Sequence, residues 1–332
     1  MKRTILLEPT SNEWESLAVL NSTAIKEKDL IHLFYRAVKS PNYSTLGYAV
    51  MKNGKLQRFS RPLLMPEFEY EIEGIEDPRI VKIKDKFYLL YTAWDGRNAR
   101  IALAVSKDMK NWQKKGIISP SIALREAIRI TKSKRYKKLW SEELRKRDND
   151  LDLFVFDKDA ILFPEKINGK FVLLHRLASD IQIVFFDSFD QLQTKEFWYN
   201  YIENIDDFVL MKPKFDWEKS KIGAGATPIK TRQGWLLLYH GVNLKNGRQY
   251  NAGAALLGLK NPEKVIARLS KPLFKPEFNW EKQGVVDNVV FPEGAVQEKD
   301  NLNIFYGCAD SRIGLAKFNF RNLMDNLAVE VA

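Results

Sequence analysis

Stretches of apolar residues recur along the chain in one arrangement that occurs five times. Each unit has an apolar stretch of about six residues followed by a second stretch of small and apolar residues, and this length and composition are typical of β-strands. Turn sequences such as Asn53-Gly54 and Asn168-Gly169 separate the stretches. The five pairs are 31–36 with 46–50, 87–93 with 101–105, 171–176 with 181–186, 235–240 with 252–258, and 302–307 with 313–318.

Two longer segments are similar to each other. Residues 58–77 and 268–287 share Arg, Ser, Pro, Leu, Pro, Glu, Phe, Glu, Gly and Asp in the same register. An internal repeat indicates structurally equivalent units. Together with the five strand pairs, it predicts an all-β fold, a five-bladed β-propeller that forms a single domain over residues 1–332. We expect the blades to begin near residues 17, 72, 157, 221 and 285.

Residues 120–155 depart from the strand pattern. Apolar residues between Leu124 and Leu144 recur at roughly helical spacing among basic residues. This spacing predicts one or two amphipathic helices inserted between blades two and three. A surface decoration, an oligomer contact and a lid over the channel are the roles open to this insertion.

The predicted propeller brings polar residues together at one end. The first strand of every blade would line a central channel, so residues just before each strand pair would meet at one mouth. Asp77 stands before such a strand, next to a proline that fixes φ and removes a donor. It is a candidate catalytic acid, or else a turn residue that caps its own backbone. The pocket expected at this mouth contains Asn21, Glu76, Asp77, Lys158, Asp159, Lys221 and Asp287.

The charge of the chain indicates an anionic partner. The formal net charge is +11, and residues 125–147 alone carry ten Lys and Arg residues against three Glu residues. Nucleic acid, a membrane surface or a phosphate-bearing small molecule would all fit this charge. No apolar run approaches the roughly 20 residues of a membrane span. The N-terminal apolar run is broken by Glu8, so we expect no secretory signal. Because Cys308 is the single cysteine, no intrachain disulfide forms, and a cytoplasmic location is favoured.

Several kinds of site are not predicted. Three histidines and one cysteine have no zinc-binding spacing, and no Gly-x-Ser-x-Gly elbow is present. We therefore expect neither a metal nor a cofactor. The segment 221–228 is a Gly-rich loop headed by Lys221 and is not a P-loop. Its backbone N–H groups and lysine would nevertheless suit an anion. Arg176 and His240 end two strands whose ends would face the channel.

Five ordered motifs resemble those of glycoside hydrolase family 130, the β-mannoside phosphorylases and mannosidases. The motifs are Gly74–Arg79, Phe163–Arg176, Lys221–Gly225, Gly234–Val242 and Tyr306–Ala316. The resemblance runs from about Asn21 to Ala316 and leaves out only the insertion. It implies a five-bladed propeller and an enzyme that acts on β-mannosides.

The resemblance also implies roles for individual residues. Asp77 is the general acid, passing its proton through the 3-hydroxyl of the mannosyl unit. Four residues fall where phosphorylases hold inorganic phosphate as a co-substrate: Lys158, Arg176, Lys221 and His240. The candidate sugar-binding residues are Asn21, Ser22, Arg36, Arg61, Tyr250 and Asp310, with Glu76 and Asp287 as further members of the expected pocket.

The residues themselves favour phosphorolysis over hydrolysis. An inverting hydrolase needs a second carboxylate about 6.5–9.5 Å from the acid to activate water. An inverting phosphorylase needs cations there instead, because phosphate is already an anionic nucleophile. The chain supplies two lysines, an arginine and a histidine. Together with the family resemblance, which implies the sugar, this predicts inverting phosphorolysis to α-mannose 1-phosphate and a shortened sugar. The substrate would be a β-1,4- or β-1,2-linked manno-oligosaccharide or a mannosyl-glucose or mannosyl-GlcNAc.

Two other functions stay open. One is an inverting β-mannosidase that uses Glu293 or Asp287 as its base. The other is a non-catalytic propeller that binds glycans or nucleic acid through the basic insertion. The expected partners are carbohydrate and phosphate, with nucleic acid less favoured, no membrane, and a homo-oligomer left open.

Overall fold

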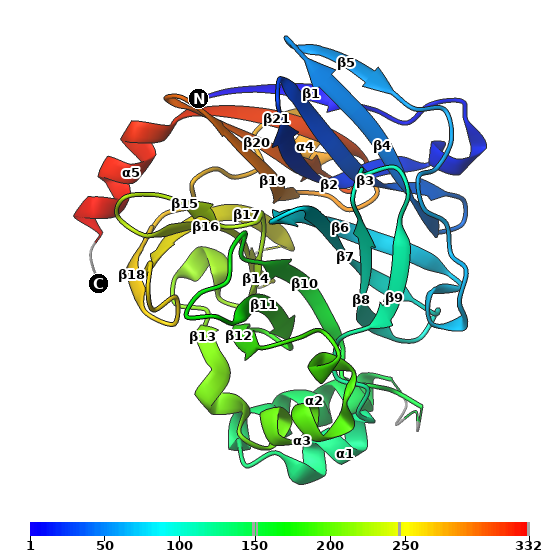
Figure 1. Ribbon diagram of the computed structural model, residues 1–332, viewed down its shortest axis with the longest axis vertical. Helices are drawn as coiled ribbons and strands as arrows, with labels where there is room; N and C mark the ends of the chain where they lie inside the picture. Colours follow the sequence, from blue (N-terminus) through cyan, green and yellow to red (C-terminus); the bar gives the residue numbers. More distant parts are fainter. Residues whose placement is uncertain (148–149, 151, 245–246, 331–332) are drawn as a thin grey trace.

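The computed structural model describes residues 1–147, 150, 152–244 and 247–330. Antiparallel strands make up most of it, and helices are few (Figure 1). The predicted all-β class is therefore confirmed. No helix in the described ranges is both long and apolar enough to span a membrane.

The strands of the described ranges form four sheets, and the largest, of eight strands, consists of two antiparallel groups joined at the parallel pair Ser44–Gly74. Five antiparallel groups therefore follow one another along the chain. The first group is β2 (Ala18–Glu27), β3 (Leu30–Lys39), β4 (Tyr43–Lys52) and β5 (Lys55–Arg58). The second is β6 (Gly74–Ile83), β7 (Lys86–Trp94), β8 (Ala99–Ser106) and β9 (Gln113–Ile117). The third is β10 (Asp157–Leu162), β11 (Phe171–Leu177), β12 (Ile181–Phe186) and β13 (Val209–Met211).

The last two groups complete the set. The fourth is β14 (Lys221–Ala224), β15 (Ile229–Lys230), β16 (Trp235–Asn243), β17 (Gln249–Leu257) and β18 (Val265–Arg268). The fifth is β19 (Val290–Glu298), β20 (Asn301–Cys308), β21 (Arg312–Asn319) and the N-terminal strand β1 (Lys2–Leu7). Because β1 pairs with β21, both ends of the chain build one group.

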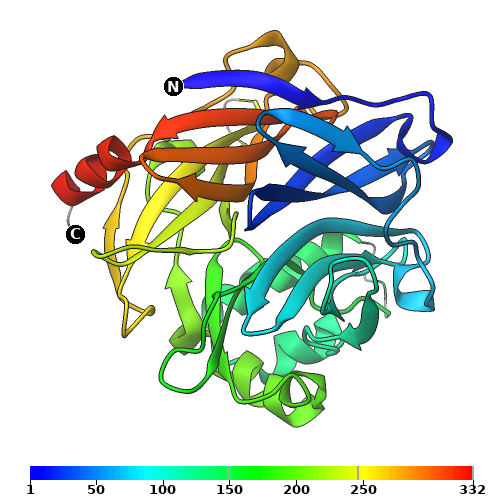
Figure 2. The same cartoon turned by 45° about the horizontal axis from the view of Figure 1, so that its top comes forward.

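The groups are arranged around a common centre (Figure 2). The first strand of each group lies nearest this centre in Figure 1. Strand β2 contacts β6 and β19, and β10 contacts β6 and β14. Apolar side chains fill the space between neighbouring groups, for example Phe34 with Leu89 and Leu238 with Ile304, all at most 1% exposed. Burial of such side chains stabilises the fold by roughly 1.5–3 kcal/mol each.

A buried glutamate recurs in four of the groups, and each one is fully buried. Glu15, Glu71, Glu218 and Glu281 accept hydrogen bonds from tyrosines of the second strands, at 2.7–2.9 Å. Each also pairs with a cation of the outermost strand or the segment beside it. The four sets, named glutamate clasps below, are Glu15–Tyr35–Arg58, Glu71–Tyr91–Lys114, Glu218–Tyr239–Arg268 and Glu281–Tyr306–Arg3.

The clasps account for the internal repeat. Its shared arginines are Arg58 and Arg268, and its shared buried glutamates are Glu71 and Glu281. Each copy of the repeat therefore completes the clasp of one group and begins the clasp of the next. The identical register reflects this packing, because removing one partner of a buried ion pair costs about 3–5 kcal/mol.

Helices α1 (Leu124–Ile130) and α2 (Lys134–Lys146) lie between β9 and β10. They gather with α3 (Lys195–Glu203) at one end of the molecule (Figure 1). Ser133 caps α2 by accepting a hydrogen bond from the backbone N–H of Tyr136. Tyr136, Trp140 and Leu144 are buried at four-residue spacing, which is the apolar stripe that the sequence pattern indicates. The remaining helices are α4 (Asn279–Lys282), α5 (Phe320–Val329) and the short 3₁₀ turns Glu13–Glu15, Glu69–Glu71, Gln191–Gln193, Ile205–Phe208 and Asp216–Glu218.

Candidate active site

A β-bulge interrupts the innermost strand of several groups at an equivalent place. The pairing register shifts between Leu20 and Thr23, between Glu76 and Arg79, and between Lys158 and Ile161. The residues at these three bulges have positive φ: Asn21 (51°), Asp77 (48°) and Asp159 (59°). Asn and Asp adopt this left-handed conformation more readily than other non-glycine residues. Bulges of this kind re-aim a side chain, and contacts between the three groups show that these polar side chains gather at the centre.

The Asp77 carboxylate lies among polar partners from the first group. Asn21 Nδ2 donates to Asp77 Oδ1 at 2.8 Å, and Arg36 Nη1 lies 3.9 Å from the same oxygen. Arg36 Nη2 pairs with Glu76 at 2.7 Å, and Lys158 Nζ donates to Glu76 at 3.2 Å. Burial acts to raise the pKa of Glu76, but the charges of Arg36 and Lys158 outweigh it and hold this pKa below its usual value. Glu76 is therefore an ionised link between the second and third groups.

The side chain of Arg79 supports the β-bulge at Asp77. Its buried guanidinium donates to the backbone oxygens of Gly225 (2.7 Å) and Asp77 (3.1 Å) and pairs with Glu293 Oε1 at 2.6 Å. Glu293 is fully buried, and its Oε2 has no hydrogen-bond partner among the described residues. Burial raises the pKa of Glu293 well above its usual value, although Arg79 acts against this. Sequence reasoning missed the role of Arg79, because two of its partners, Gly225 and Glu293, are 146 and 214 residues away.

A cationic cluster lies on the other side of Glu76. It consists of Lys158, Arg176, Lys221 and His240, the four residues predicted to hold phosphate, and it surrounds Asp159. Arg176 Nε donates to Asp159 Oδ2, and His240 Nε2 lies 3.7 Å from the same oxygen. Burial acts to raise the pKa of Asp159, but Arg176 and His240 hold it well below its usual value. Asp159 is thus an ionised anchor for the cluster.

Burial shifts the pKa values of the residues in the cationic cluster. Burial, with Arg176 and Lys221 nearby, lowers the pKa of His240 to about 3. Burial and the charge of Arg176 also lower the pKa of Lys221. Burial acts to lower the pKa of Arg176 too, but Asp159 overcomes it and raises this pKa. His240 is therefore neutral at pH 7, while the positive charge of the cluster resides on Lys158, Arg176 and Lys221.

The segment that begins at Lys221 corrects the sequence interpretation. Residues 221–224 form strand β14 and not a Gly-rich loop. A Cβ atom on Gly223 would lie 2.1 Å from Asp159 Oδ2 and 2.4 Å from His240 Cε1. Gly223 therefore permits the close approach of Asp159 and His240. The glycine is required by packing, and no exposed backbone cradle for an anion is formed here.

Tyr250 and Asp310 lie at the edge of the cluster. Arg248 Nη2 donates to Tyr250 Oη at 3.2 Å, and Lys221 Nζ lies 5.3 Å from the centre of the tyrosine ring. Burial acts to raise the pKa of Tyr250, but Lys221 and Arg248 lower it. Burial and the charge of Asp77 raise the pKa of Asp310 to about 6, against the effect of Arg36. Arg248 is a second residue that sequence reasoning missed, because no motif contains it.

Three predicted sugar-binding residues are less closely tied to the centre. Ser22 is buried beside Asn21, and its Oγ has no partner among the described residues. Arg61 is exposed. Asp287 is exposed too, and its carboxylate accepts a hydrogen bond from Gly284 N at 3.2 Å. The repeat made Asp287 the counterpart of Asp77, and this match is wrong in structural terms. The residue at the register shift of β19 is Glu293.

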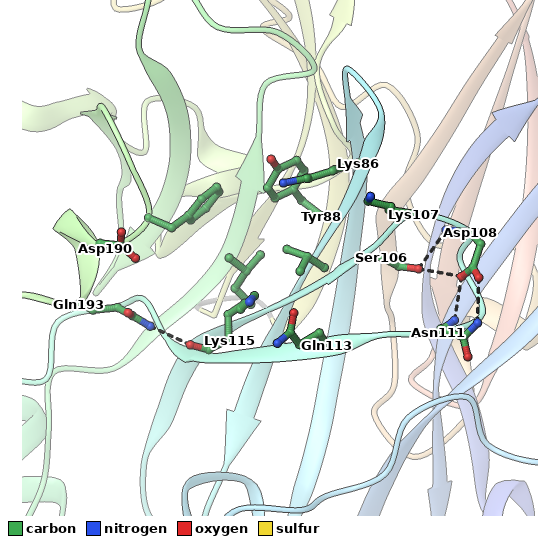
Figure 3. Close-up of a pocket in the computed structure, with 13 residues that line it drawn as sticks. Lys86, Tyr88, Ser106, Lys107, Asp108, Asn111, Gln113, Lys115, Asp190 and Gln193 are labelled. Atoms are coloured by element: carbon green, nitrogen blue, oxygen red, sulfur yellow. Dashed lines mark hydrogen bonds between the residues drawn. The ribbon is translucent and has the colours of Figure 1, made fainter.

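Two cavities differ in their relation to these residues. One of 230 Å³ lies between α2 and the cationic cluster, with Lys158, Arg176 and Lys221 in its wall. The other, of 590 Å³, lies at the outer strands of the second group and is shown in Figure 3. Its wall includes Lys86, Tyr88 and Asn111 but none of the candidate site residues. The chemistry described above therefore belongs to the centre of the molecule and the smaller cavity.

Ion-paired carboxylates, the partly exposed Asp77 and the cations around the buried Asp159 lie together at the centre, an arrangement typical of sites that bind sugars and anions. Comparison with known proteins agrees with this class. Residues 7–329 match the family model described as beta-1,4-mannooligosaccharide phosphorylase. The chain therefore belongs to glycoside hydrolase family 130, so the resemblance found in the sequence is confirmed and the protein is an enzyme.

Two relatives are similar over nearly their whole lengths. The 1,2-beta-oligomannan phosphorylase of Thermoanaerobacter sp. (strain X514) is 38% identical over 331 residues, 96% of each chain. The beta-1,2-mannobiose phosphorylase of the same strain is 39% identical over 330 residues, 94% of this chain and 93% of the relative. The solved structure of the beta-1,2-mannobiose phosphorylase from Listeria innocua, in complex with beta-1,2-mannobiose, has the same fold. It gives a TM-score of 0.73 at 24% identity, covering 95% of this chain and 93% of that one.

Proposed function

We propose that the enzyme phosphorolyses β-mannosides with inversion, releasing α-mannose 1-phosphate and a shortened sugar. The observation that carries this proposal is the pairing of the carboxylates around Asp77. Glu76 pairs with Arg36 and Lys158, Asp159 with Arg176, and Glu293 with Arg79. A base that activates water would have to be a free, ionised carboxylate, and none of these three fits that role.

The cationic cluster supplies what phosphorolysis needs. Phosphate brings its own negative charge, so the enzyme has only to position and desolvate it. Arg176 offers a planar fork of donors, and Lys158 and Lys221 act as point charges. Neutral His240 adds one N–H donor without adding charge. We assign these four residues to the phosphate and Asp77 to the leaving group, as the family resemblance implies.

The proposed reaction balances without a metal or cofactor. A phosphate oxygen attacks the anomeric carbon of the mannosyl unit, and the bond from that carbon to the bridging oxygen breaks. The proton of Asp77 reaches the bridging oxygen by way of the 3-hydroxyl of the same sugar. Asn21 and Arg36 hold the Asp77 carboxylate in place, and the ion pairs of Glu76 fix it between the acid and the phosphate side. The released sugar departs neutral, and the proton that hydrogen phosphate loses on becoming the phosphate ester restores the acid form of Asp77 through solvent.

We propose β-1,2-linked mannosides as the first substrates to test, because both relatives of nearly equal length are named for that linkage. The family model is described for the β-1,4 linkage, which is the second choice. We further infer that the five strand groups are the blades of a propeller, that 120–155 is a helical insertion between blades two and three, and that the enzyme acts in the cytoplasm.

The test is a comparison of turnover with and without phosphate. Purified enzyme is incubated with β-1,2-mannobiose or β-1,4-mannobiose, and both mannose 1-phosphate and free mannose are measured. The proposal requires mannose 1-phosphate that depends on added phosphate. Equal release of mannose in phosphate-free buffer would support the hydrolase instead, and then Glu293 would have to act as base despite its burial.

A further inference from the structure

The 230 Å³ cavity beside the cationic cluster has a wall that belongs to the insertion. Trp140 and Lys146 of α2 line one side, and Lys158, Arg176 and Lys221 line the other. Asp77 is not among its lining residues in the described ranges. The cavity therefore reaches the cationic cluster without passing the candidate acid. Its volume is below the roughly 300–1,000 Å³ of pockets for drug-sized ligands.

The stereochemistry of an inverting reaction indicates which reactant could occupy the α2 cavity. In an inverting displacement the nucleophile and the leaving group stand on opposite faces of the sugar ring. In the proposed reaction Asp77 serves the leaving group and the cations serve the nucleophile, so a cavity lined by Lys158, Arg176 and Lys221 but not by Asp77 lies on the nucleophile's side. Its 230 Å³ suits phosphate, which is much smaller than an oligosaccharide.

Aromatic contacts and a backbone hydrogen bond hold Phe154 and Phe156 in the cavity wall. The Phe156 ring lies under the Arg147 guanidinium at 4.7 Å and meets Trp94 edge to face at 6.4 Å. Phe154 N donates to Asn98 Oδ1 at 2.8 Å, which ties this segment to the second strand group. Both phenylalanines line the cavity. Two residues of the cavity wall are thus fixed by contacts with Arg147 and with the second group.

The charge around the cavity favours an anion. Lys146, Lys158, Arg176 and Lys221 line it against two acids, Glu142 and Glu143. Glu143 is itself paired with Arg147 at 3.6 Å. The rest of α2 adds further lysines and arginines on its outer face. A cleft lined by one sign of charge raises the local concentration and the on-rate of the opposite ion by 10-fold to 10³-fold.

We propose that α2 and the cationic cluster enclose a separate entrance for inorganic phosphate, and that the basic insertion steers phosphate into it. The inference rests on the proposed phosphorolysis and adds the route of the second substrate. Phosphate would reach the cluster through the α2 cavity while the mannoside occupies the central channel. The sequence left the role of the insertion open. In this proposal the insertion raises kcat/KM for phosphate and has no effect on KM for the mannoside.

The test compares charge variants on two faces of α2. Lys146→Glu changes a residue that lines the cavity, and Lys138→Glu makes the same charge change at an exposed residue of α2 that does not line it. At low salt we expect Lys146→Glu to lower kcat/KM for phosphate on the order of threefold to tenfold, and Lys138→Glu clearly less. The loss should shrink at 0.15 M salt and above, where charges are screened beyond about 8 Å. Glu142→Gln should act in the opposite direction.

A steric variant tests the route independently of charge. Leu139→Trp places a larger side chain in the cavity wall and should lower kcat/KM for phosphate while KM for the mannoside stays unchanged. If the wild type shows no phosphate-dependent turnover, the proposed function fails, and the entrance fails with it. If turnover depends on phosphate but Lys146→Glu and Lys138→Glu behave alike, or folded Leu139→Trp has wild-type phosphate kinetics, the entrance alone is overturned. Should Leu139→Trp not fold, the pair of charge variants decides.

Discussion

The second and third strand groups carry the same bulge and use it for opposite purposes. Asp77 and Asp159 share the bulge position and a positive φ of 48° and 59°. The Asp77 side chain is 10% exposed, whereas that of Asp159 is 2% exposed and is bonded to Arg176. The preceding residues, Glu76 and Lys158, have opposite charges and pair with each other. The same bulge thus leaves a carboxylate partly exposed in one group and holds a cation in the next.

The two groups also differ in the residue that their second strand places next to the bulged strand. The second has the glutamate clasp of Glu71, Tyr91 and Lys114. In the third, His175 replaces the tyrosine and bonds to Asp157 Oδ2 and Tyr201 Oη, both at 2.8 Å. Tyr201 comes from α3. The group that bears Lys158 and Arg176 is therefore supported by α3 through Tyr201, and Arg135 of α2 pairs with Asp180 of the same group.

The largest expected effect comes from the bulge of the second group. Asp77→Asn should keep the fold and lower kcat at least about a hundredfold, since general acid catalysis contributes roughly 10²–10⁴. The loss should be smaller for an aryl mannoside with a good leaving group, because it needs less protonation. Steady-state kinetics on both substrates measure this. Equal losses would mean that Asp77 only positions the sugar and that another group supplies the proton.

The clasp of the second group should carry the next largest effect. Glu71→Gln leaves the buried cation Lys114 with only the longer pair to the exposed Glu67, at 3.6 Å, and we expect a loss of about 3–5 kcal/mol in the free energy of unfolding. Glu143→Gln, which breaks a half-exposed pair with Arg147, should cost at most about 1 kcal/mol. Urea denaturation of both variants provides the comparison. Similar costs would mean that the clasps do not hold the strand groups together.

The cations of the third group give the third prediction. Arg176→Ala removes charge-assisted hydrogen bonds worth roughly 1.5–3 kcal/mol, so KM for phosphate should rise at least about tenfold. KM for the mannoside should change far less. Lys166→Ala, at an exposed lysine of the same group, serves as the control. If neither variant alters the phosphate dependence, the phosphate site lies elsewhere.

The smallest effect concerns Asp310. Because its folded-state pKa is raised to about 6, the folded protein favours the protonated acid. The stabilisation that comes from protonated Asp310 is fully present below pH 4, the approximate pKa of Asp in the unfolded chain. It is lost as the pH rises through 6, the pKa in the folded protein. Asp310→Asn should therefore gain stability relative to the wild type between pH 4 and 6, by about 1–2 kcal/mol. Parallel urea stabilities of the two proteins across this range would contradict the shift.

The sequence predicted the parts that depend on local pattern. Alternating apolar stretches gave the strands, and placement before a strand brought Asp77, Lys158 and Asp159 toward one centre. What the sequence could not give depends on distant contacts. The Arg79–Glu293 pair joins residues 214 positions apart, and Gly223 is required only because Asp159 and His240 come from other strands. The internal repeat was recognised, but its matching residues form the buried glutamate clasps. It therefore matched Asp77 with Asp287, whereas the residue at the equivalent bulge is Glu293.

The central claim is that cations, and not a second carboxylate, serve the nucleophile. The most direct measurement is proton NMR of β-1,2-mannobiose with the wild-type enzyme in phosphate buffer, followed from the first minutes. The account predicts that α-mannose 1-phosphate appears first, together with one equivalent of mannose, and that no reaction occurs without phosphate. Release of mannose at the same rate in phosphate-free buffer, or first formation of the β-phosphate, would contradict it.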